Sequence, residues 1–154
     1  MWCGVGGRLL REPVRGGAGT VAHVVEFAEI MYLLARGGFV CRGLSRGPMP
    51  GNPPPRLWET QGGMINSVGL QNIGVREFVR GKLPQLRNYR TAVFANVFGY
   101  APEDYTDVVR LLEDAEGIAG YELNVRCPNR KPGGFAFSPA PGLPAGGVGG
   151  VRGF

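Results

Sequence analysis

Apolar residues recur at three- and four-residue spacing in three stretches of the chain, which is the pattern of amphipathic helices. The first stretch covers residues 22–36 and ends at Gly37. The second covers Ile73–Leu86, and the third begins at Ala101 and ends at Gly117. The side chains expected to face a core are Val24, Phe27, Ala28, Met31, Leu34, Ala35, Val75, Phe78, Val79, Leu83, Tyr105, Val108, Val109, Leu112 and Ala115.

Short apolar runs between these helices predict strands at Gly38–Cys41, Ala92–Val97 and Gly120–Val125. The helix between the last two strands gives a crossover long enough for a parallel pair, so the fold class is α/β. Parallel strands bring Asn96 and Asn124 to the same edge of the sheet. In α/β barrels the chemistry takes place at this C-terminal edge, which makes the two amides a candidate site.

Two glycine- and proline-rich stretches separate the first strand from the second helix. Pro48–Pro55 is expected to be extended, and Trp58–Asn72 is expected to be a loop. A loop of this length inside a compact domain usually has a function. The alternative is a glycine turn in which asparagine side chains cap backbone groups.

The stretch Gly120–Asn129 reads G-Y-E-L-N-V-R-C-P-N and combines a strand with a polar loop. Tyr121, Leu123 and Val125 alternate on one face, and Pro128 ends the strand. The amide of Asn124 can both donate and accept hydrogen bonds, which suits a small polar ligand. The thiol of Cys127, just beyond the strand, suits proton transfer or nucleophilic catalysis. The alternative is a buried structural cysteine beside a turn.

A short strand around residues 13–14 is expected to lead into a loop at Ala18–Thr20. Arg15, Gly16 and Gly17 interrupt its apolar run. The same region matches the dinucleotide fingerprint G-x-G-x-x-A at Gly17, Gly19 and Ala22. However, the preceding strand is weak and no acidic residue closes a clear second strand, so we do not favour a dinucleotide site.

Composition and charge exclude several classes of protein. The net charge of +5 comes from scattered arginines without aromatic interleaving, which does not indicate nucleic-acid binding. The three cysteines and the single histidine, His23, show no metal-ligand spacing and fit a reducing compartment. No stretch approaches the roughly 20 apolar residues of a membrane span, and no signal peptide begins the chain, so we expect a cytoplasmic protein.

The composition changes at about Phe135. Residues 135–154 are dominated by Gly, Pro and Ala and lack a helical period. We therefore divide the chain into a folded part, residues 1–134, and a tail, residues 135–154, that is either disordered or read out of frame.

Four motifs together carry a resemblance to a known family. They are G-N-P-P-P-R at Gly51–Arg56, W-E-T-Q-G-G-M-I-N-S-V-G-L-Q-N at Trp58–Asn72, V-F-A-N-V-F-G at Val93–Gly99, and E-L-N-V-R-C-P-N at Glu122–Asn129. In this order and at this spacing the chain resembles class 1 dihydroorotate dehydrogenases, whose last motif reads E-L-N-x-S-C-P-N. The resemblance implies the N-terminal half of an FMN-binding (β/α)8 barrel, truncated before the phosphate site.

The resemblance also implies a role for individual residues. Cys127 is the base that removes a proton from dihydroorotate. The substrate, and its product orotate, contact Arg42, Asn66, Ser67, Val68, Gly69, Leu70 and Asn124. The flavin contacts Ala18, Arg42, Gly43, Asn96 and Asn124. Arg42 replaces the family's lysine, Ala18 its usual serine, and Arg126 its usual serine beside the base.

G-L-Q-N and G-N-P-P-P-R look more like class 1B, which implies electron transfer to NAD through an iron–sulfur FAD subunit. A homodimer is also implied. The implied function is oxidation of dihydroorotate to orotate in pyrimidine (UMP) biosynthesis. The alternatives are a non-catalytic truncated fragment, or another FMN-barrel reductase that acts on a pyrimidine.

Overall fold

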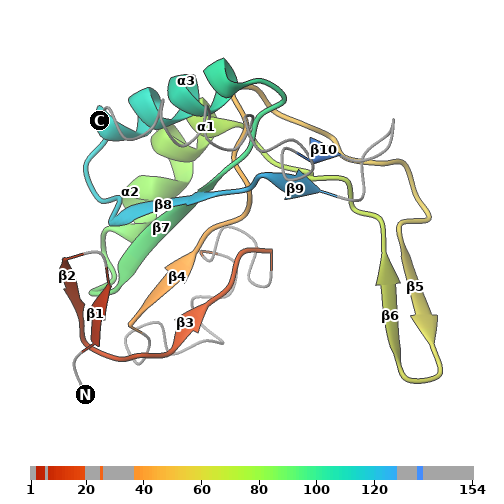
Figure 1. Ribbon diagram of the computed structural model, residues 1–154, viewed down its shortest axis with the longest axis horizontal. Coiled ribbons are helices and arrows are strands. Elements are labelled where there is room, and N and C mark those ends of the chain that lie inside the picture. The colour runs from red at the N-terminus through yellow and green to blue at the C-terminus, as the bar shows by residue number, and fades with distance from the viewer. Residues whose placement is uncertain (1–2, 6, 20–24, 26–36, 128–134, 137–154) are drawn as a thin grey trace.

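A four-stranded parallel sheet with the order β3-β4-β7-β8 forms the centre of the fold (Figure 1). The computed structural model describes residues 3–5, 7–19, 25, 37–127 and 135–136. The strands are β3 (Arg15–Gly16), β4 (Gly38–Val40), β7 (Ala92–Val97) and β8 (Gly120–Leu123). The predicted parallel strands and α/β class are therefore confirmed, with four strands where a complete barrel has eight.

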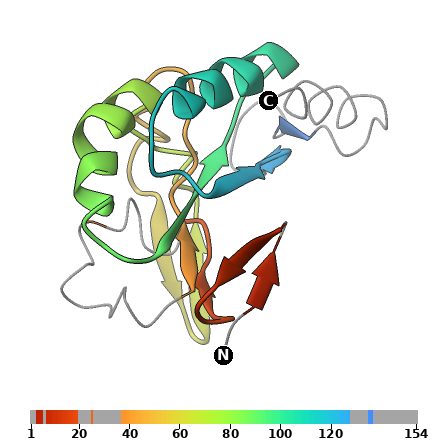
Figure 2. The same cartoon turned by 90° about the vertical axis from the view of Figure 1, so that its left-hand side faces the viewer.

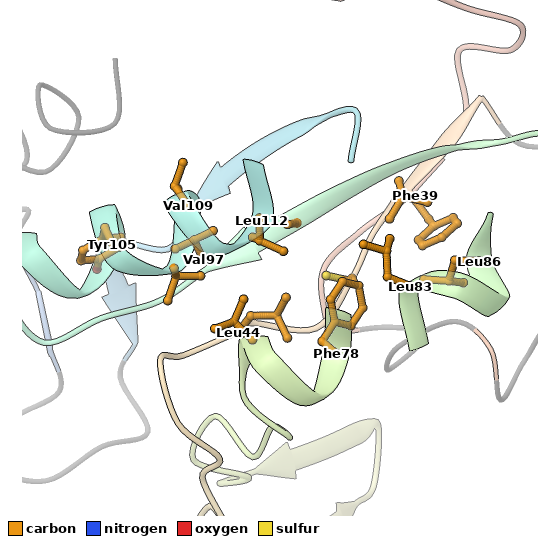
Figure 3. Packing of buried hydrophobic residues seen from close by; sticks show 14 residues of the cluster. Phe39, Leu44, Phe78, Leu83, Leu86, Val97, Tyr105, Val109 and Leu112 are labelled. Carbon is orange, nitrogen blue, oxygen red and sulfur yellow. The ribbon is translucent and has the colours of Figure 1, made fainter. Parts of the chain in front are cut away.

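Helices cover one face of the sheet (Figures 1 and 2). Figure 3 shows labelled side chains from two helical segments, residues 75–86 and residues 102–113, on the side that faces the strands. The core between them is apolar, and most of its side chains are fully buried. Its members are Phe39, Cys41, Leu44, Val75, Phe78, Leu83, Leu86, Val93, Ala95, Val97, Tyr105, Val108, Val109 and Leu112. Most core-facing residues predicted from the second and third helices are in this set, with Val79 and Ala115 packed against it.

Helix α3 (Pro102–Glu113) begins where the sequence predicts. Pro102 occupies the first turn, where its missing N–H costs nothing. The Asp104 carboxylate accepts hydrogen bonds from the backbone N–H groups of Tyr100 (2.8 Å) and Ala101 (3.1 Å). These contacts satisfy free donors at the positive end of the helix. Gly117 follows in the left-handed region, at φ +107°, and the chain turns into β8.

The predicted helix over residues 73–86 is present but irregular. It consists of α1 (Val75–Glu77), a π-helical turn η3 (Phe78–Lys82) and α2 (Leu83–Leu86). Pro84 is the second residue of α2. It has no backbone N–H, so it cannot donate a hydrogen bond to the carbonyl four residues earlier. The Leu83 N–H instead reaches back to the carbonyl of Phe78, which is the wider spacing of a π turn. Periodicity predicts the buried face but not this local widening.

One predicted loop and one predicted strand position differ from the structure. Within the predicted loop Trp58–Asn72, β5 (Leu57–Thr60) and β6 (Gly63–Asn66) form an antiparallel hairpin that extends away from the sheet (Figure 1). Its two-residue turn at Gln61–Gly62 is typical of a hairpin. Near the N-terminus, the residues expected to interrupt a strand, Arg15 and Gly16, form β3 themselves by pairing with Gly38 and Phe39.

Two further strand pairs are short. β1 (Cys3–Val5) pairs with β2 (Arg8–Leu10), and β9 (Arg126–Cys127) pairs with β10 (Phe135–Ala136), both antiparallel. Residues 126–127 are thus a strand rather than the expected loop, and the first two residues of the expected tail pair with them. The rest of the tail and the predicted helix 22–36, except Val25, lie outside the described residues. No helix in the described part is long and apolar enough to cross a membrane.

Candidate functional site

A cavity of about 590 Å³ lies where the parallel strands end. The ends of β4, β7 and β8 contribute Arg42 and Gly43, Asn96 and Asn124. The base of the β5–β6 hairpin and the segment after it close another side. The lining residues are Ala18, Gly19, Arg42, Gly43, Leu57, Met64, Asn66, Val68, Gly69, Leu70, Asn96 and Asn124. Most residues singled out in the sequence therefore lie around one cavity.

Asn96 is a buried amide on the cavity side of β7, with only 4% of its surface exposed. Its Nδ2 donates to Oε1 of Glu122 at 2.5 Å, because the two residues are register partners in β7 and β8. Its Oδ1 lies beside Gly43, where an added Cβ would approach to 3.0 Å. Glycine at position 43 therefore lets the end of β4 pass close to this amide.

The backbone of Asn124 is fixed on both sides. Its N–H donates to the carbonyl of Val97 at 2.8 Å, which continues the ladder beyond β8. Its carbonyl accepts from the hydroxyl of Tyr105 at 2.8 Å. Tyr105 is 1% exposed in the core, and burial raises the pKa of its hydroxyl to about 12, so the hydroxyl remains a donor. Helix α3 thus holds the strand end that carries this amide.

The segment 66–70 bends sharply toward the cavity. Gly69 and Leu70 are consecutive left-handed residues, at φ 74° and 57°. A side chain at Gly69 would lie 2.7 Å from Cγ of Asn52, so both the backbone and the neighbour favour glycine. Asn52 Nδ2 in turn donates to Ser67 at its carbonyl (3.0 Å) and its Oγ (3.1 Å). The proline-rich stretch, residues 48–55, therefore stabilises the segment 66–70 through the hydrogen bonds of Asn52.

Arg42 brings a positive charge to the cavity. Burial, and secondly the charge of Arg56, lower the pKa of its guanidinium. Arginine nevertheless stays protonated in proteins, so the cavity has a permanent cation. Ala18 and Gly19, at the end of β3, are small residues that leave room for a ligand beside it.

One predicted site residue with a described side chain, Ser67, does not line the cavity. Ser67 is exposed and holds Asn52, as described above. Cys127 lies in β9, three residues beyond Asn124, and its backbone pairs with Phe135. Its role as a base stays a prediction.

Sequence analysis missed two apolar residues of the cavity, Leu57 and Met64. Register places Leu57 opposite Asn66, and Met64 opposite Glu59. Because side chains alternate across a strand, Leu57, Met64 and Asn66 share one face of the hairpin. The signal was the two-residue turn Gln61–Gly62, which would have predicted a hairpin and its alternating faces.

A larger hollow, of about 840 Å³, lies between residues 46–50 and the helix that begins at Val75. Its buried amide, Asn72, is already engaged by the protein. Oδ1 accepts from the N–H of Gly74 (2.8 Å) and from Oγ of Ser45 (3.0 Å), and Nδ2 donates to the Leu70 carbonyl (2.9 Å). Asn72 therefore maintains the turn rather than recognising a ligand, and we place the site in the smaller cavity.

The thiol of Cys41 belongs to the core and not to the cavity. It is fully buried, and burial raises its pKa from 9.0 to about 12. Such a thiol is inert at neutral pH. Among the described residues, no cluster of histidine, cysteine and carboxylate side chains could hold a metal ion.

Comparison with known proteins shows the family of the chain. The sequence model of the family described as "Dihydroorotate dehydrogenase" matches residues 4–150. The chain belongs to the dihydroorotate dehydrogenase family. It is 60% identical over 141 residues to a Solibacter usitatus protein, provisionally named dihydroorotate dehydrogenase A (fumarate). It is 44% identical over 138 residues to the catalytic subunit of dihydroorotate dehydrogenase B (NAD(+)) of Citrifermentans bemidjiense.

The match covers nearly all of this chain but only part of its relatives. The two alignments span 92% and 90% of the chain, and 45% of each relative. A crystal structure of dihydroorotate dehydrogenase from Eimeria tenella, in complex with ferulenol, superposes with a TM-score of 0.76. That superposition covers 99% of this chain and 43% of the other, at 15% identity, and shows the shared fold. The chain is thus a partial barrel that spans about half the length of these relatives.

Proposed function

We propose that this chain supplies the substrate-binding half of a dihydroorotate dehydrogenase, which oxidises dihydroorotate to orotate in pyrimidine (UMP) biosynthesis. The observation that carries the proposal is the convergence of Asn66, Asn96, Asn124 and Arg42 on one cavity at the C-terminal edge of the sheet. Amides and a cation suit a ligand that has both ring amides and a carboxylate.

Each part of the substrate finds a matching group in this cavity. Asn66 and Asn124 can donate to and accept from the ring amides, and the guanidinium of Arg42 can pair with the carboxylate. The segment Val68–Leu70 adds an apolar wall beside these polar groups. Tyr105 and Asn52 do not reach the cavity lining, but they hold the residues that do.

The cavity also fits the ring system of FMN. Asn96 offers a buried amide, and Ala18, Gly19 and Gly43 leave room for a flat ring to approach the backbone. When bound, FMN accepts the hydride that leaves the substrate. In barrels of this kind the phosphate group binds after the seventh and eighth strands, so its site lies beyond the four strands described here.

Cys127 is the residue we propose as the base. It follows the substrate-facing Asn124 by three residues on the same chain segment. As a thiolate it would take the ring proton while the hydride leaves from the neighbouring carbon, which balances the two-electron oxidation. We also propose that the charge of Arg126, the preceding residue, where the family has serine, favours the thiolate.

For the electron acceptor, two observations lead to two candidates. The motifs G-L-Q-N and G-N-P-P-P-R favour NAD+, reached through an iron–sulfur FAD subunit. The name of the 60% identical relative favours fumarate. We propose the NAD+ route first, together with a cytoplasmic homodimer of the catalytic subunit, and fumarate as the second candidate.

The test uses a complete barrel, here called the joined protein. Residues 1–134 of this chain are followed by the C-terminal part of the Solibacter usitatus relative. We expect a yellow protein that reduces a dye in the presence of dihydroorotate. Turnover with fumarate alone would favour the fumarate route over NAD+.

Two other outcomes would contradict the proposal. A folded joined protein without flavin would favour a non-catalytic fragment. A yellow protein that ignores dihydroorotate but oxidises or reduces another pyrimidine would favour a different FMN-barrel reductase.

A further inference from the structure

Glu122 begins the motif E-L-N-V-R-C-P-N and lies beside Asn96, but the resemblance assigns it no role. It lies opposite Asn96 in the β7–β8 register, and its side chain is on the same face as Asn124 because strand residues alternate. Its Oε1 accepts a hydrogen bond from Asn96 Nδ2 at 2.5 Å. Asn96 is almost completely buried, whereas Glu122 is exposed. The exposed carboxylate therefore fixes one end of a buried amide.

An ionised carboxylate accepts hydrogen bonds and cannot donate them, so only the NH2 end of the amide can face Glu122. The carbonyl end must then point the other way. It lies beside Gly43, where an added Cβ would come within 3.0 Å of Oδ1. Gly43 and Asn96 both line the cavity. The amide thus presents an acceptor, and not a donor, on the side toward the end of β4.

We propose that Glu122 is a positioning residue that sets the direction of the Asn96 amide, so that the cavity offers a hydrogen-bond acceptor to an N–H group of the bound ring. The inference rests on the proposed function, because it assigns Asn96 to the flavin. Without Glu122 the amide could rotate by half a turn and exchange its donor for its acceptor. The N–H group of the bound ring would then face the NH2 group of Asn96, which is also a donor, and the affinity for the ring would fall.

The experiment is a double-mutant cycle on FMN affinity in the joined protein, measured by quenching of flavin fluorescence. We expect Glu122→Ala to raise the Kd for FMN about tenfold, as loss of a charge-assisted hydrogen bond would. Glu122→Gln should raise it only about threefold, because its carbonyl can still accept from Asn96. Glu116→Ala, which removes an exposed carboxylate in the α3–β8 connection, is the matched control and should leave the Kd unchanged.

The second half of the cycle separates positioning from general damage. In an Asn96→Ala background, Glu122→Ala should change the Kd by less than about twofold, because the amide it orients is gone. A full tenfold change in that background would mean that Glu122 acts on the flavin or on folding by another route, and would overturn the inference.

A flavin-free measurement distinguishes this inference from the proposed function. The side-chain NH2 signals of Asn96, identified by their loss in Asn96→Ala, should shift in an NMR spectrum of Glu122→Ala and stay in place in Glu116→Ala. Unmoved signals would refute the hydrogen bond itself. If the parent protein binds no FMN, the proposed function fails and the positioning role fails with it. If the parent binds FMN and Glu122→Ala binds it equally well, the positioning role alone is wrong.

Discussion

The two faces of β7 carry different kinds of residue and are packed differently. Val93, Ala95 and Val97 point toward the helices and are at most 3% exposed. On the other face, Phe94 lies beside two positions without side chains, Gly38 and Gly120, and under the guanidinium of Arg15. Asn96 follows on that face, bonded to Glu122. One face is thus a dry apolar layer, and the other ends in a polar cavity.

The helix-facing side of β7 therefore contributes mainly to the stability of the fold, and the cavity side mainly to ligand binding. Burial of the apolar face stabilises the fold in proportion to the area removed from water. The polar face stabilises little, since its amides and charges lose water as they gain partners. We therefore expect substitutions on the helix side to change the free energy of unfolding, and substitutions at the cavity end to change ligand binding or turnover.

The largest effect expected at the cavity end is on catalysis. In the joined protein, Cys127→Ala should reduce turnover of dihydroorotate by roughly 10²–10⁴-fold, as removal of a general base does. FMN should remain bound, since the substitution leaves unchanged the cavity residues that would contact the flavin. Initial rates at neutral pH and the flavin absorbance measure both. Full turnover in Cys127→Ala would exclude this residue as the base.

The corresponding effect on the helix side is a loss of stability. Phe78 is fully buried between the helices and the sheet, so Phe78→Ala should lower the free energy of unfolding by about 3–5 kcal/mol. Trp58→Ala removes a larger ring, but Trp58 is 68% exposed on the hairpin, and it should change stability by no more than about 0.5 kcal/mol. Urea unfolding of both variants measures these changes. Equal losses of unfolding free energy in Phe78→Ala and Trp58→Ala would contradict the prediction.

A smaller effect concerns the thiol in the core. The folded protein keeps the proton of Cys41 up to about pH 12, whereas an unfolded chain loses it near pH 9.0. The unfolded state therefore binds fewer protons between these values, and the contribution to stability, complete below pH 9.0, is lost as the pH rises toward 12.

The measurement compares the wild type with Cys41→Ala in urea at pH 9 and pH 11. From pH 9 to pH 11, the free energy of unfolding of the wild type should fall by on the order of 2 kcal/mol more than that of the variant. Parallel losses would mean that the thiol is not held neutral by the fold. The tyrosines of the core titrate in both proteins, so the difference isolates Cys41.

The spacing of apolar residues predicts the helices and strands that bury one face. It does not predict elements whose side chains are all exposed. Strands β4, β7 and β8 and helix α3 follow from their apolar spacing, and the shared edge of Asn96 and Asn124 follows from the crossover. Periodicity does not predict the β5–β6 hairpin, because all residues of its two strands are exposed and no buried face marks it. The π turn before Pro84 depends on a local hydrogen-bond choice that apolar spacing does not encode.

The same limit applies to the site. Single motifs identify Asn66, Asn96 and Asn124, but which side chain holds which amide depends on the register between strands. The pairing of Asn96 with Glu122, and the support of Asn124 by Tyr105, join residues far apart in sequence. These partners become visible only when β7, β8 and α3 are placed beside one another.

The close approach of Gly43 to Asn96 has a consequence for how this family can vary. The backbone of Gly43 does not lie in the left-handed region, so its conformation alone would accept any residue. The oxygen of Asn96 is what crowds a side chain there, because an added Cβ would lie 3.0 Å from it and the amide would have to shift by a few tenths of an ångström. Alanine at position 43 should therefore be favoured by a smaller residue at position 96. The two positions are expected to covary, whereas Gly69, restricted by its own backbone as well as by Asn52, has no such partner that could release it.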